Sequence, residues 1–290
     1  MSSSDPAGAT QRWRLDLAYD GHAFSGFAYQ PHHDTVVGLL RSTLASTLRL
    51  AHEPLIIGAG RTDAGVHAFN QVVHVDVPVV VKVRSLDSER LMRSLNKQLR
   101  GRVQVLRAEP VSDDFHARFS ALWREYRYLV LETPEPGLDS TNAWAWSVEG
   151  PLNVASMNRV AKDVLGTHDF RAFCRRPSNA EAGEPLLRKV LSAKWERVPD
   201  EWVMTPRRTP TLRLTIRAQS FCHNMVRCLV STMVAIGRGT LPVSSIDDRL
   251  ESLDRHQLPQ AAPAAGLALI AVGYESDSAN GSGSNLKATR

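Results

Sequence analysis

The chain of 290 residues is longer than one average domain, so we expect two domains or one fused pair. With 43% hydrophobic and 22% charged residues, its composition is ordinary for a soluble globular protein. The 35 Lys and Arg residues exceed the 30 Asp and Glu residues, which gives a net charge of +5 and a pI near 9.3. This excess suits a polyanionic partner, although many proteins with such a charge bind none.

The sequence carries no sign of secretion or membrane association. Residues 1–14 lack the apolar core of a signal peptide, and no apolar run approaches the roughly 20 residues that a membrane helix needs. The three cysteines, Cys174, Cys222 and Cys228, include no CxxC pair, and an odd number is a poor basis for a disulfide framework. We therefore expect a reducing compartment and a cytoplasmic location.

The two ends of the chain, residues 1–11 and 276–290, are rich in Ser, Gly, Ala and Asn and can bury little apolar surface, so we expect disordered tails. The apolar spacing of the first half then predicts the order β-α-β-β-α-β. Asp34 is the expected N-cap of its first helix, and Gly101 the stop of its second. The elements are strand 13–19, helix 37–48, strands 55–57 and 71–77, helix 88–99 and strand 103–107.

The second half repeats this mixture of strands and helices. The expected elements are strand 125–131, helix 153–165 stopped by Gly166, strands 189–197 and 211–218, helix 224–236, a capped helix from Ser244 and strand 267–273. We predict an α+β protein of two ferredoxin-like or RRM-like units, with antiparallel sheets side by side. A polar loop at 113–120 places the boundary between an N-terminal domain, 12–118, and a C-terminal domain, 119–275.

The segment 58–67 concentrates glycines around Arg61 and Asp63, directly after an apolar strand and before another. Because glycine allows close backbone approach, this turn can present both charged side chains at a ligand surface. A tight turn with a mere surface ion pair is the alternative. A phosphate loop is excluded, since GxGxxG needs glycine at position 63 and a P-loop needs Lys-Ser/Thr where Val66 and His67 stand.

Residues 60–67, Gly-Arg-Thr-Asp-Ala-Gly-Val-His, resemble the catalytic segment of the TruA family of tRNA pseudouridine synthases. The similarity extends over residues 13–274. Further matching motifs are Tyr19-Asp20-Gly21 with Phe24 and Gly26, residues 113–120, Tyr126-Arg127-Tyr128, His168-Asp169-Phe170, Asn224-Met225-Val226-Arg227, and Gly266-Leu267 onward.

Two departures from the family pattern concern peripheral tRNA contacts. Phe27-Ala28 stands where many members have Trp-Gln, and the stretches 79–84 and 200–211 align poorly. The catalytic segment itself is unaffected.

The resemblance implies a pseudouridine synthase fold with a central basic cleft for the tRNA anticodon stem-loop, and a homodimer. It also implies isomerisation of uridine to pseudouridine at positions 38, 39 and 40. This reaction breaks the N1–C1′ bond and joins C5 to C1′ without redox change or group donor, so no cofactor is expected. No metal is expected either, because the ten histidines, His32, His33 and His223 among them, show no finger or zincin spacing.

Within this resemblance Asp63 is the nucleophile, which adds either to C6 of the base or to C1′ of the sugar. Arg227 is the expected counter-ion that keeps the carboxylate charged, and Arg61 the residue that flips the nucleotide out, although these two roles could be exchanged. Tyr126 is the expected aromatic platform for the extracted base; it could instead be a core aromatic of its strand.

Further substrate contacts are expected around these residues. The loop 113–120 mixes cationic and aromatic side chains suited to phosphates and unstacked bases, but such loops also anchor domain junctions. A charge run after Phe170 suits the tRNA backbone or is simply a solvated face. The expected substrate-binding residues are Thr62, Phe115, His116, Arg118 and Phe119, and the weaker candidates are Arg171, Arg175 and Arg176.

Two other functions remain open. A non-catalytic tRNA-binding or RNA-folding protein could use the same scaffold, although pure binding gains nothing from a carboxylate facing phosphates. A pseudouridine synthase acting on another RNA, ribosomal or messenger, would carry the same catalytic residues.

Overall fold

The computed structural model describes residues 9–79, 87–133, 144–175, 183–199, 210–254, 258–275 and 277. Arg176, and most of the poorly matching stretches 79–84 and 200–211, lie outside the described residues.

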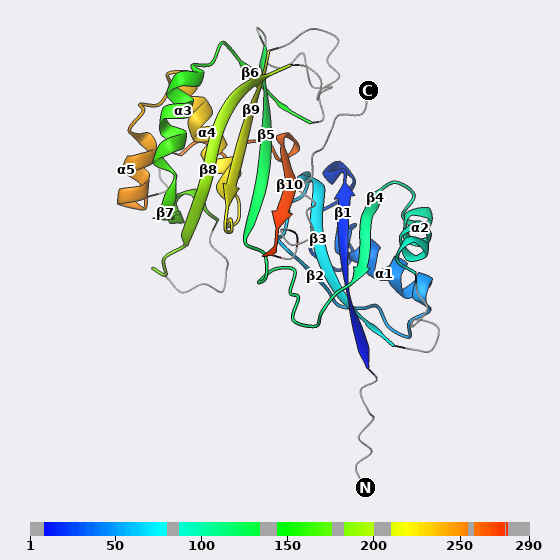
Figure 1. The fold of residues 1–290 in the computed structure, drawn as a ribbon. Helices are drawn as coiled ribbons and strands as arrows, with labels where there is room; N and C mark the ends of the chain where they lie inside the picture. Colours follow the sequence, from blue (N-terminus) through cyan, green and yellow to red (C-terminus); the bar gives the residue numbers. More distant parts are fainter. Residues whose placement is uncertain are drawn as a thin grey trace.

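The N-terminal half has the predicted β-α-β-β-α-β order (Figure 1). β1 pairs antiparallel with both β3 and β4, and the short β2 pairs with β3. The register sets Leu15 opposite Val73, and both are fully buried against the helices. The elements are β1 (Thr10–Tyr19), η1 (Gly21–Ala23), α1 (Val36–Leu48), β2 (Ile56–Gly58), β3 (His67–Pro78), α2 (Ser88–Leu99) and β4 (Val103–Pro110).

The C-terminal half forms the second unit of strands and helices, drawn on the left of Figure 1. β5 lies between β9 and β10, and β8 pairs with β9 and β7. The elements are β5 (Trp123–Thr133), β6 (Trp146–Glu149), α3 (Val154–Asp163), β7 (Gly166–Asp169), η2 (Arg171–Phe173), β8 (Leu187–Val198), β9 (Thr211–Ala218), α4 (Met225–Gly237), α5 (Ser245–Ser252), η4 (Ala264–Gly266) and β10 (Leu267–Gly273).

The two units lie side by side, which confirms the predicted mixed architecture, but their sheets are continuous. The strand order is β4-β1-β3-β10-β5-β9-β8-β7, with β2 and β6 added beside β3 and β5. The seam is a parallel pairing of β3 with β10, at His67 with Ala268 and Ala68 with Leu269. Because β10 pairs with β3 on one side and with β5 on the other, it joins the strands of the two halves into one sheet. The division into domains 12–118 and 119–275 stays a prediction.

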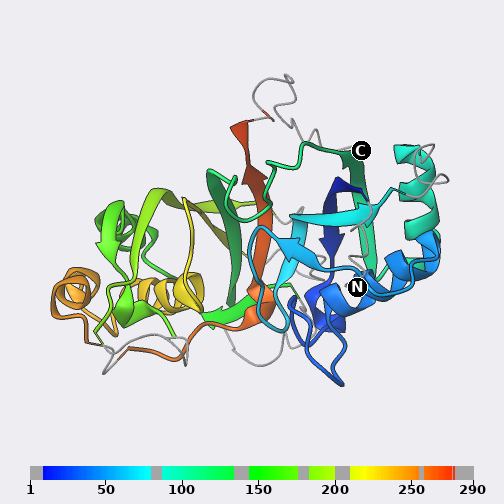
Figure 2. The same ribbon diagram turned by 90° about the horizontal axis from the view of Figure 1, so that it is seen from below.

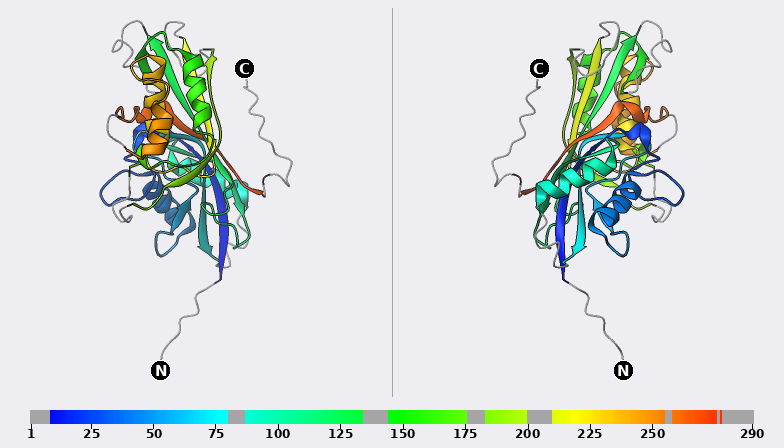
Figure 3. Two further views of the ribbon diagram at one scale, coloured as in Figure 1. Left: turned by 90° about the vertical axis from the view of Figure 1, so that its left-hand side faces the viewer. Right: turned by 90° about the vertical axis from the view of Figure 1, so that its right-hand side faces the viewer.

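The helices of both halves cover the same face of this sheet. Across the seam, the register places Tyr19 opposite Ala68, Ala68 beside Leu269, and Leu269 opposite Tyr126, so these side chains share one face. Figure 2 shows α1 and α4 below the sheet on its two halves. The end views of Figure 3 show α3 and α5 closing one end and α2 the other.

Several element boundaries differ from the sequence prediction. Thr35, and not Asp34, caps α1, because its hydroxyl accepts the Gly38 N–H at 3.1 Å. Asp34 instead pairs with Arg102 at 3.1 Å. The α3 helix ends at Asp163, and Gly166, at φ +95°, begins β7 rather than directly stopping the helix.

Two strands, β6 and β7, were not expected. Each has four residues, too few for an alternating pattern to appear, and each gains its conformation by pairing with a longer strand. The C-terminal half therefore has two more strands than its sequence pattern predicts.

The described residues extend into both of the predicted tails. Thr10 and Gln11 belong to β1, where Gln11 pairs with Val77. Asp277 accepts from Arg14 at 2.7 Å, and Arg14 is 3% exposed. Within the described residues, no helix is long and apolar enough to cross a membrane.

We predict that Asp277→Asn lowers the free energy of unfolding by about 1.5 kcal/mol, because buried Arg14 loses one of its two carboxylate partners and keeps only Asp16. Urea denaturation of the variant measures this change. Glu275→Gln removes the same charge from an exposed neighbour and is the control. Equal effects from both substitutions would show that the Arg14 contact contributes nothing specific.

Candidate active site

The loop 59–66 joins β2 to β3 and is docked on the segment that follows β1. An added Cβ on Gly21 would lie 2.2 Å from the carbonyl oxygen of Val66, so only glycine allows this approach. Gly26 has φ +116° and packs on the backbone of residues 62–64. The Phe27 N–H donates to the Thr62 carbonyl at 3.1 Å. The glycines of both motifs thus fix where Asp63 lies.

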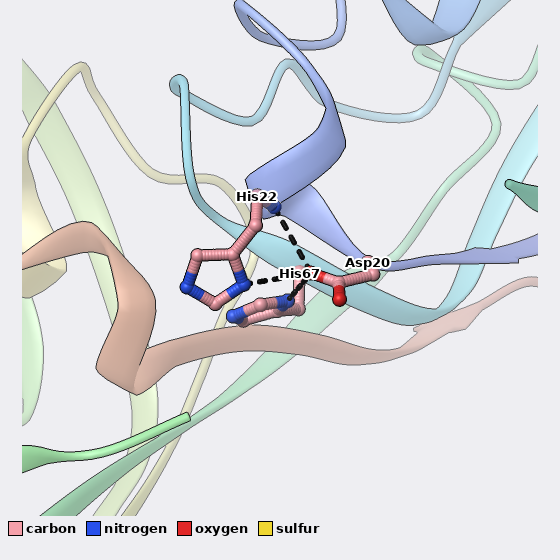
Figure 4. Close-up of side chains that lie close together, drawn as sticks. All are labelled: Asp20, His22 and His67. Atoms are coloured by element: carbon pink, nitrogen blue, oxygen red, sulfur yellow. Dashed lines mark hydrogen bonds and ion pairs between the residues drawn. The ribbon is translucent and has the colours of Figure 1, made fainter. Parts of the chain in front are cut away.

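A cluster of Asp20, His22 and His67 supports this docking at the start of β3 (Figure 4). The Nδ1 atom of His67 accepts the Gly21 N–H at 3.0 Å, and its Nε2 lies 3.1 Å from the Ala265 carbonyl oxygen. Burial lowers the pKa of His67 to about 4, so the ring is neutral near pH 7. Both ring nitrogens are engaged, so the cluster offers a metal no lone pair from His67.

Asp63 is held from the other half of the molecule. Its Oδ2 accepts a hydrogen bond from Arg227 Nη1 at 3.1 Å, and its Oδ1 lies 3.3 Å from His223 Nε2. The Asp63 side chain is 29% exposed, so the carboxylate is partly sheltered but open on one side. The Arg227 contact is the one that a counter-ion requires, and the role itself stays a prediction.

Arg227 lies in the first turn of α4 and is fixed on several sides. Its Nε donates to the Ala262 carbonyl at 2.7 Å, and its Nη1 also donates to Asn224 Oδ1 at 3.1 Å. Asn224 precedes α4 with φ +66°. The guanidinium is therefore oriented before any substrate binds, which favours a defined electrostatic role over a mobile surface pair.

Tyr126 on β5 lies close to this carboxylate. The residue is 8% exposed and packs edge-on against Phe221, with ring centroids 5.2 Å apart. Burial, with smaller contributions from Tyr19 and Asp63, raises the pKa of its phenol, which is therefore neutral near pH 7. The ring is part of the core and lies near Asp63, and its role as a platform for the base stays a prediction.

Thr62 and Arg61 differ in exposure. Thr62 is buried, and its hydroxyl shares a hydrogen bond of 2.9 Å with Tyr19, whose pKa burial raises to about 12. Arg61 is exposed, and its side chain has no hydrogen bond or ion pair with any residue that the structure describes. Thr62 thus supports the loop, while Arg61 is available to a ligand; substrate binding by either stays a prediction.

The loop 113–120 packs against both halves. Phe115 packs on Tyr274 at 5.0 Å between ring centroids, and the Nδ1 atom of His116 accepts the N–H groups of Arg118 and Phe119. Buried Arg124 donates to the carbonyls of Arg118 and Ala59, which ties this loop to the Asp63 loop. Among the described residues, none of the four predicted substrate-binding residues of this loop contacts Asp63. They are Phe115, His116, Arg118 and Phe119.

Of these four, Arg118 and Phe119 are exposed. The Phe119 side chain is 75% exposed and lies under the Arg118 guanidinium at 5.3 Å. Phe115 is half-buried and anchors the junction, as the alternative interpretation of the loop proposes. Contact of any of them with RNA stays a prediction.

The region after β7 corrects the expectation from the cysteine count. Cys174 and Cys222 form a disulfide, with Cα atoms 5.8 Å apart and a sequence separation of 48. Next to the disulfide, the Arg175 N–H donates a hydrogen bond to the His223 carbonyl at 2.9 Å. Tertiary folding creates this pair, so spacing in the sequence could not reveal it. Arg171 is paired with Asp169 at 2.7 Å, which leaves it less available to RNA.

A small apolar cavity of about 50 Å³ lies outside the set of predicted site residues. His67, Phe69 and Trp144 are among its lining residues, and Trp144 stacks on His67 with ring centroids 3.8 Å apart. None of the predicted site residues lines this cavity. It is therefore not the place where Asp63 meets a substrate.

A family model described as tRNA pseudouridine synthase matches residues 17–120 and 160–275, which is more than half of the chain. The chain belongs to this family. Its matched segments contain Asp63, Arg227 and Tyr126, so the residues gathered here all fall inside the family match. The recognised resemblance to the TruA family is thereby confirmed.

Curated relatives named tRNA pseudouridine synthase A agree with this assignment. The relative from Cutibacterium acnes is 38% identical over 266 residues, covering 92% of this chain and 90% of its own. Those from Streptomyces griseus and Bacillus subtilis are 37% and 33% identical, cover 92% and 91% of this chain, and match over 89% and 99% of their own lengths. A chain in the crystal structure of a Cbf5–Nop10–Gar1 complex matches with a TM-score of only 0.29 at 14% identity, over 77% of this chain and 44% of that chain.

In this pseudouridine synthase, His223 is the site residue that sequence reasoning did not identify. His223, which follows Cys222, was considered from the sequence only as a possible metal ligand, and it has no metal-ligand spacing. Its position directly before the Asn224–Arg227 motif was the available signal, because Arg227 was already expected beside Asp63.

We predict that the stability of the synthase falls as pH decreases from about 6.5 toward 4, because unfolded His67 takes up a proton that the folded state excludes. His67→Gln should reduce by about 2 kcal/mol the loss of unfolding free energy between pH 7 and pH 5. Urea denaturation at the two pH values measures this difference. The exposed His52→Gln is the control; an unchanged pH dependence in His67→Gln would contradict the assignment of a buried neutral ring.

Proposed function

We propose that this protein isomerises uridine to pseudouridine at positions 38, 39 and 40 in the anticodon stem-loop of tRNA, with Asp63 as nucleophile. Its membership of the tRNA pseudouridine synthase family supports uridine isomerisation in tRNA. The observation that carries the catalytic assignment is the contact of 3.1 Å between Asp63 and Arg227, which come from opposite halves of the chain.

The reaction needs few protein groups. The N1–C1′ bond breaks, the base rotates, C5 bonds to C1′, one proton leaves C5 and one is gained at N1. A charged carboxylate can add to C1′ or C6, and the Arg227 guanidinium favours the charged form of Asp63. We propose that Tyr126, which packs on Phe221, stacks on the extracted base.

Binding of the polyanionic substrate is supported by charge. The chain has a net charge of +5, and Arg61 is an exposed cation two residues before the nucleophile. We propose that Arg61 occupies the place of the flipped nucleotide, and that Thr62, Phe115, His116, Arg118 and Phe119 complete the substrate-binding surface. A homodimer, a cytoplasmic location and independence from cofactors are parts of the same proposal.

We predict that Asp63→Asn makes no detectable pseudouridine and retains tRNA affinity within about twofold, because the amide keeps the shape of the side chain but is a poor nucleophile. The measurement is incubation with an unmodified tRNA transcript in chelator, followed by site-resolved pseudouridine mapping and a binding titration. Product from the wild type should appear only at positions 38 to 40.

The same incubation, repeated with ribosomal and messenger RNA transcripts beside the tRNA, separates the competing functions. A wild-type protein that binds tRNA tightly but makes no product would favour the non-catalytic RNA-binding protein. Product in ribosomal or messenger RNA, with none in tRNA, would favour a synthase with another substrate. Asp63→Asn protein that still forms product would remove Asp63 from the mechanism.

We predict that Arg61→Ala slows modification of a base-paired target uridine about tenfold, which is roughly 1.4 kcal/mol, and slows an unpaired target less. The reason is that flipping a nucleotide costs least where it is already unpaired. Single-turnover rates on paired and mismatched stem-loops measure this difference, with the exposed Arg90→Ala on α2 as the control. An equal defect on both substrates would assign Arg61 to a role other than base flipping.

A further inference from the structure

The Asp63 carboxylate has a second neighbour besides its counter-ion. His223 Nε2 lies 3.3 Å from Asp63 Oδ1, while Arg227 holds Oδ2. An ionised carboxylate oxygen only accepts hydrogen bonds, so this contact is favourable when Nε2 carries the hydrogen. In the neutral ring Nδ1 then keeps the lone pair, and Nδ1 has no hydrogen-bond partner among the described residues.

The imidazole is open to solvent, but its backbone is fixed. The His223 side chain is 44% exposed, so a bound nucleotide can reach the ring. The His223 carbonyl accepts the Arg175 N–H at 2.9 Å, and the preceding Cys222 is joined to Cys174. An accessible ring on a restrained backbone is suited to act on a substrate at a defined position.

The isomerisation requires a proton acceptor after the new bond has formed. When C5 has bonded to C1′, C5 still carries its hydrogen, and the product forms only when that proton leaves. The bonding electrons of C5–H then return to the ring, and N1 gains a proton. A group that accepts the C5 proton must be near Asp63, because the reacting sugar and base are both held there.

The other groups around the carboxylate are poorly suited to this step. The Arg227 guanidinium is already protonated and cannot accept a proton. Tyr126 is a buried neutral phenol, because burial raises its pKa. The released Asp63 carboxylate has His223 beside Oδ1 and the Arg227 donor on Oδ2, so both of its oxygens are already engaged. His223 is the remaining titratable group in contact with it among the described residues.

We propose that His223 is the general base that removes the C5 proton through Nδ1, an inference that rests on the proposed function. The proton moves from C5 to Nδ1 and gives an imidazolium. Asp63 leaves the substrate as a carboxylate, from C1′ when C5 bonds there or from C6 as the C5 proton departs, and at 3.3 Å it stabilises the new positive charge. Proton transfer to solvent then restores the neutral ring, and the pair returns to its starting state.

The test compares rates on stem-loops containing uridine with hydrogen or deuterium at C5. His223→Gln should lower the single-turnover rate about 100-fold, with stem-loop affinity unchanged, since general bases contribute at least this much. C5–H cleavage should then limit the rate, so the primary deuterium isotope effect should be larger than in the wild type. His52→Gln, a substitution of an exposed histidine, is the control and should match the wild type.

A merely positioning role for His223 gives a different result. In that case the variant is slower but shows no larger isotope effect, and the general-base proposal is overturned; an unchanged rate overturns it as well. His223→Ala provides a second variant, whose rate imidazole in solution should raise if the missing group is a proton acceptor. Failure of the proposed function is distinct, because the wild type itself would then form no pseudouridine.

Discussion

The site depends on one contact across the middle of the molecule. The Asp63 loop belongs to the N-terminal half, and Arg227 lies at the start of α4 in the C-terminal half, 164 residues later. The strands that join these halves, β3 and β10, pair at only two positions, His67 with Ala268 and Ala68 with Leu269. Any change in that register would move the carboxylate away from the guanidinium. The continuous sheet is therefore what makes a single site from two units.

The fold was predictable from sequence where a local pattern determines the structure. The α2 helix has the predicted bounds, since Asp87 caps it and its apolar residues recur at helical spacing. The N-cap of α1 was less predictable, because Asp34 and Thr35 are adjacent and both residue types are good caps. Asp34 pairs with Arg102 in the folded protein, and Thr35 caps the helix. Short strands such as β6 depend on a partner strand, so their own residues carry little signal.

The candidate site was predictable mainly through its motifs. Glycines around residues 61–63 indicate a loop that approaches another backbone, and the structure supplies that backbone at Gly21. The contact of His223 with Asp63 and the disulfide between Cys174 and Cys222 join residues far apart in sequence. Neither has a local pattern, because the loop before α4 meets the loop between β2 and β3 at Asp63, and the residue after η2 at Cys174. Long-range packing is the information that a single sequence lacks.

The most direct test is a crystal structure of the Asp63→Asn variant bound to an anticodon stem-loop RNA. The account predicts a uridine flipped out of the stem, its C1′ or C6 facing residue 63, Tyr126 against the base, and Arg227 still beside residue 63. A target uridine that remains stacked in the stem, or one bound where residue 63 and Arg227 face away from it, would contradict the assignment of this loop as the catalytic centre.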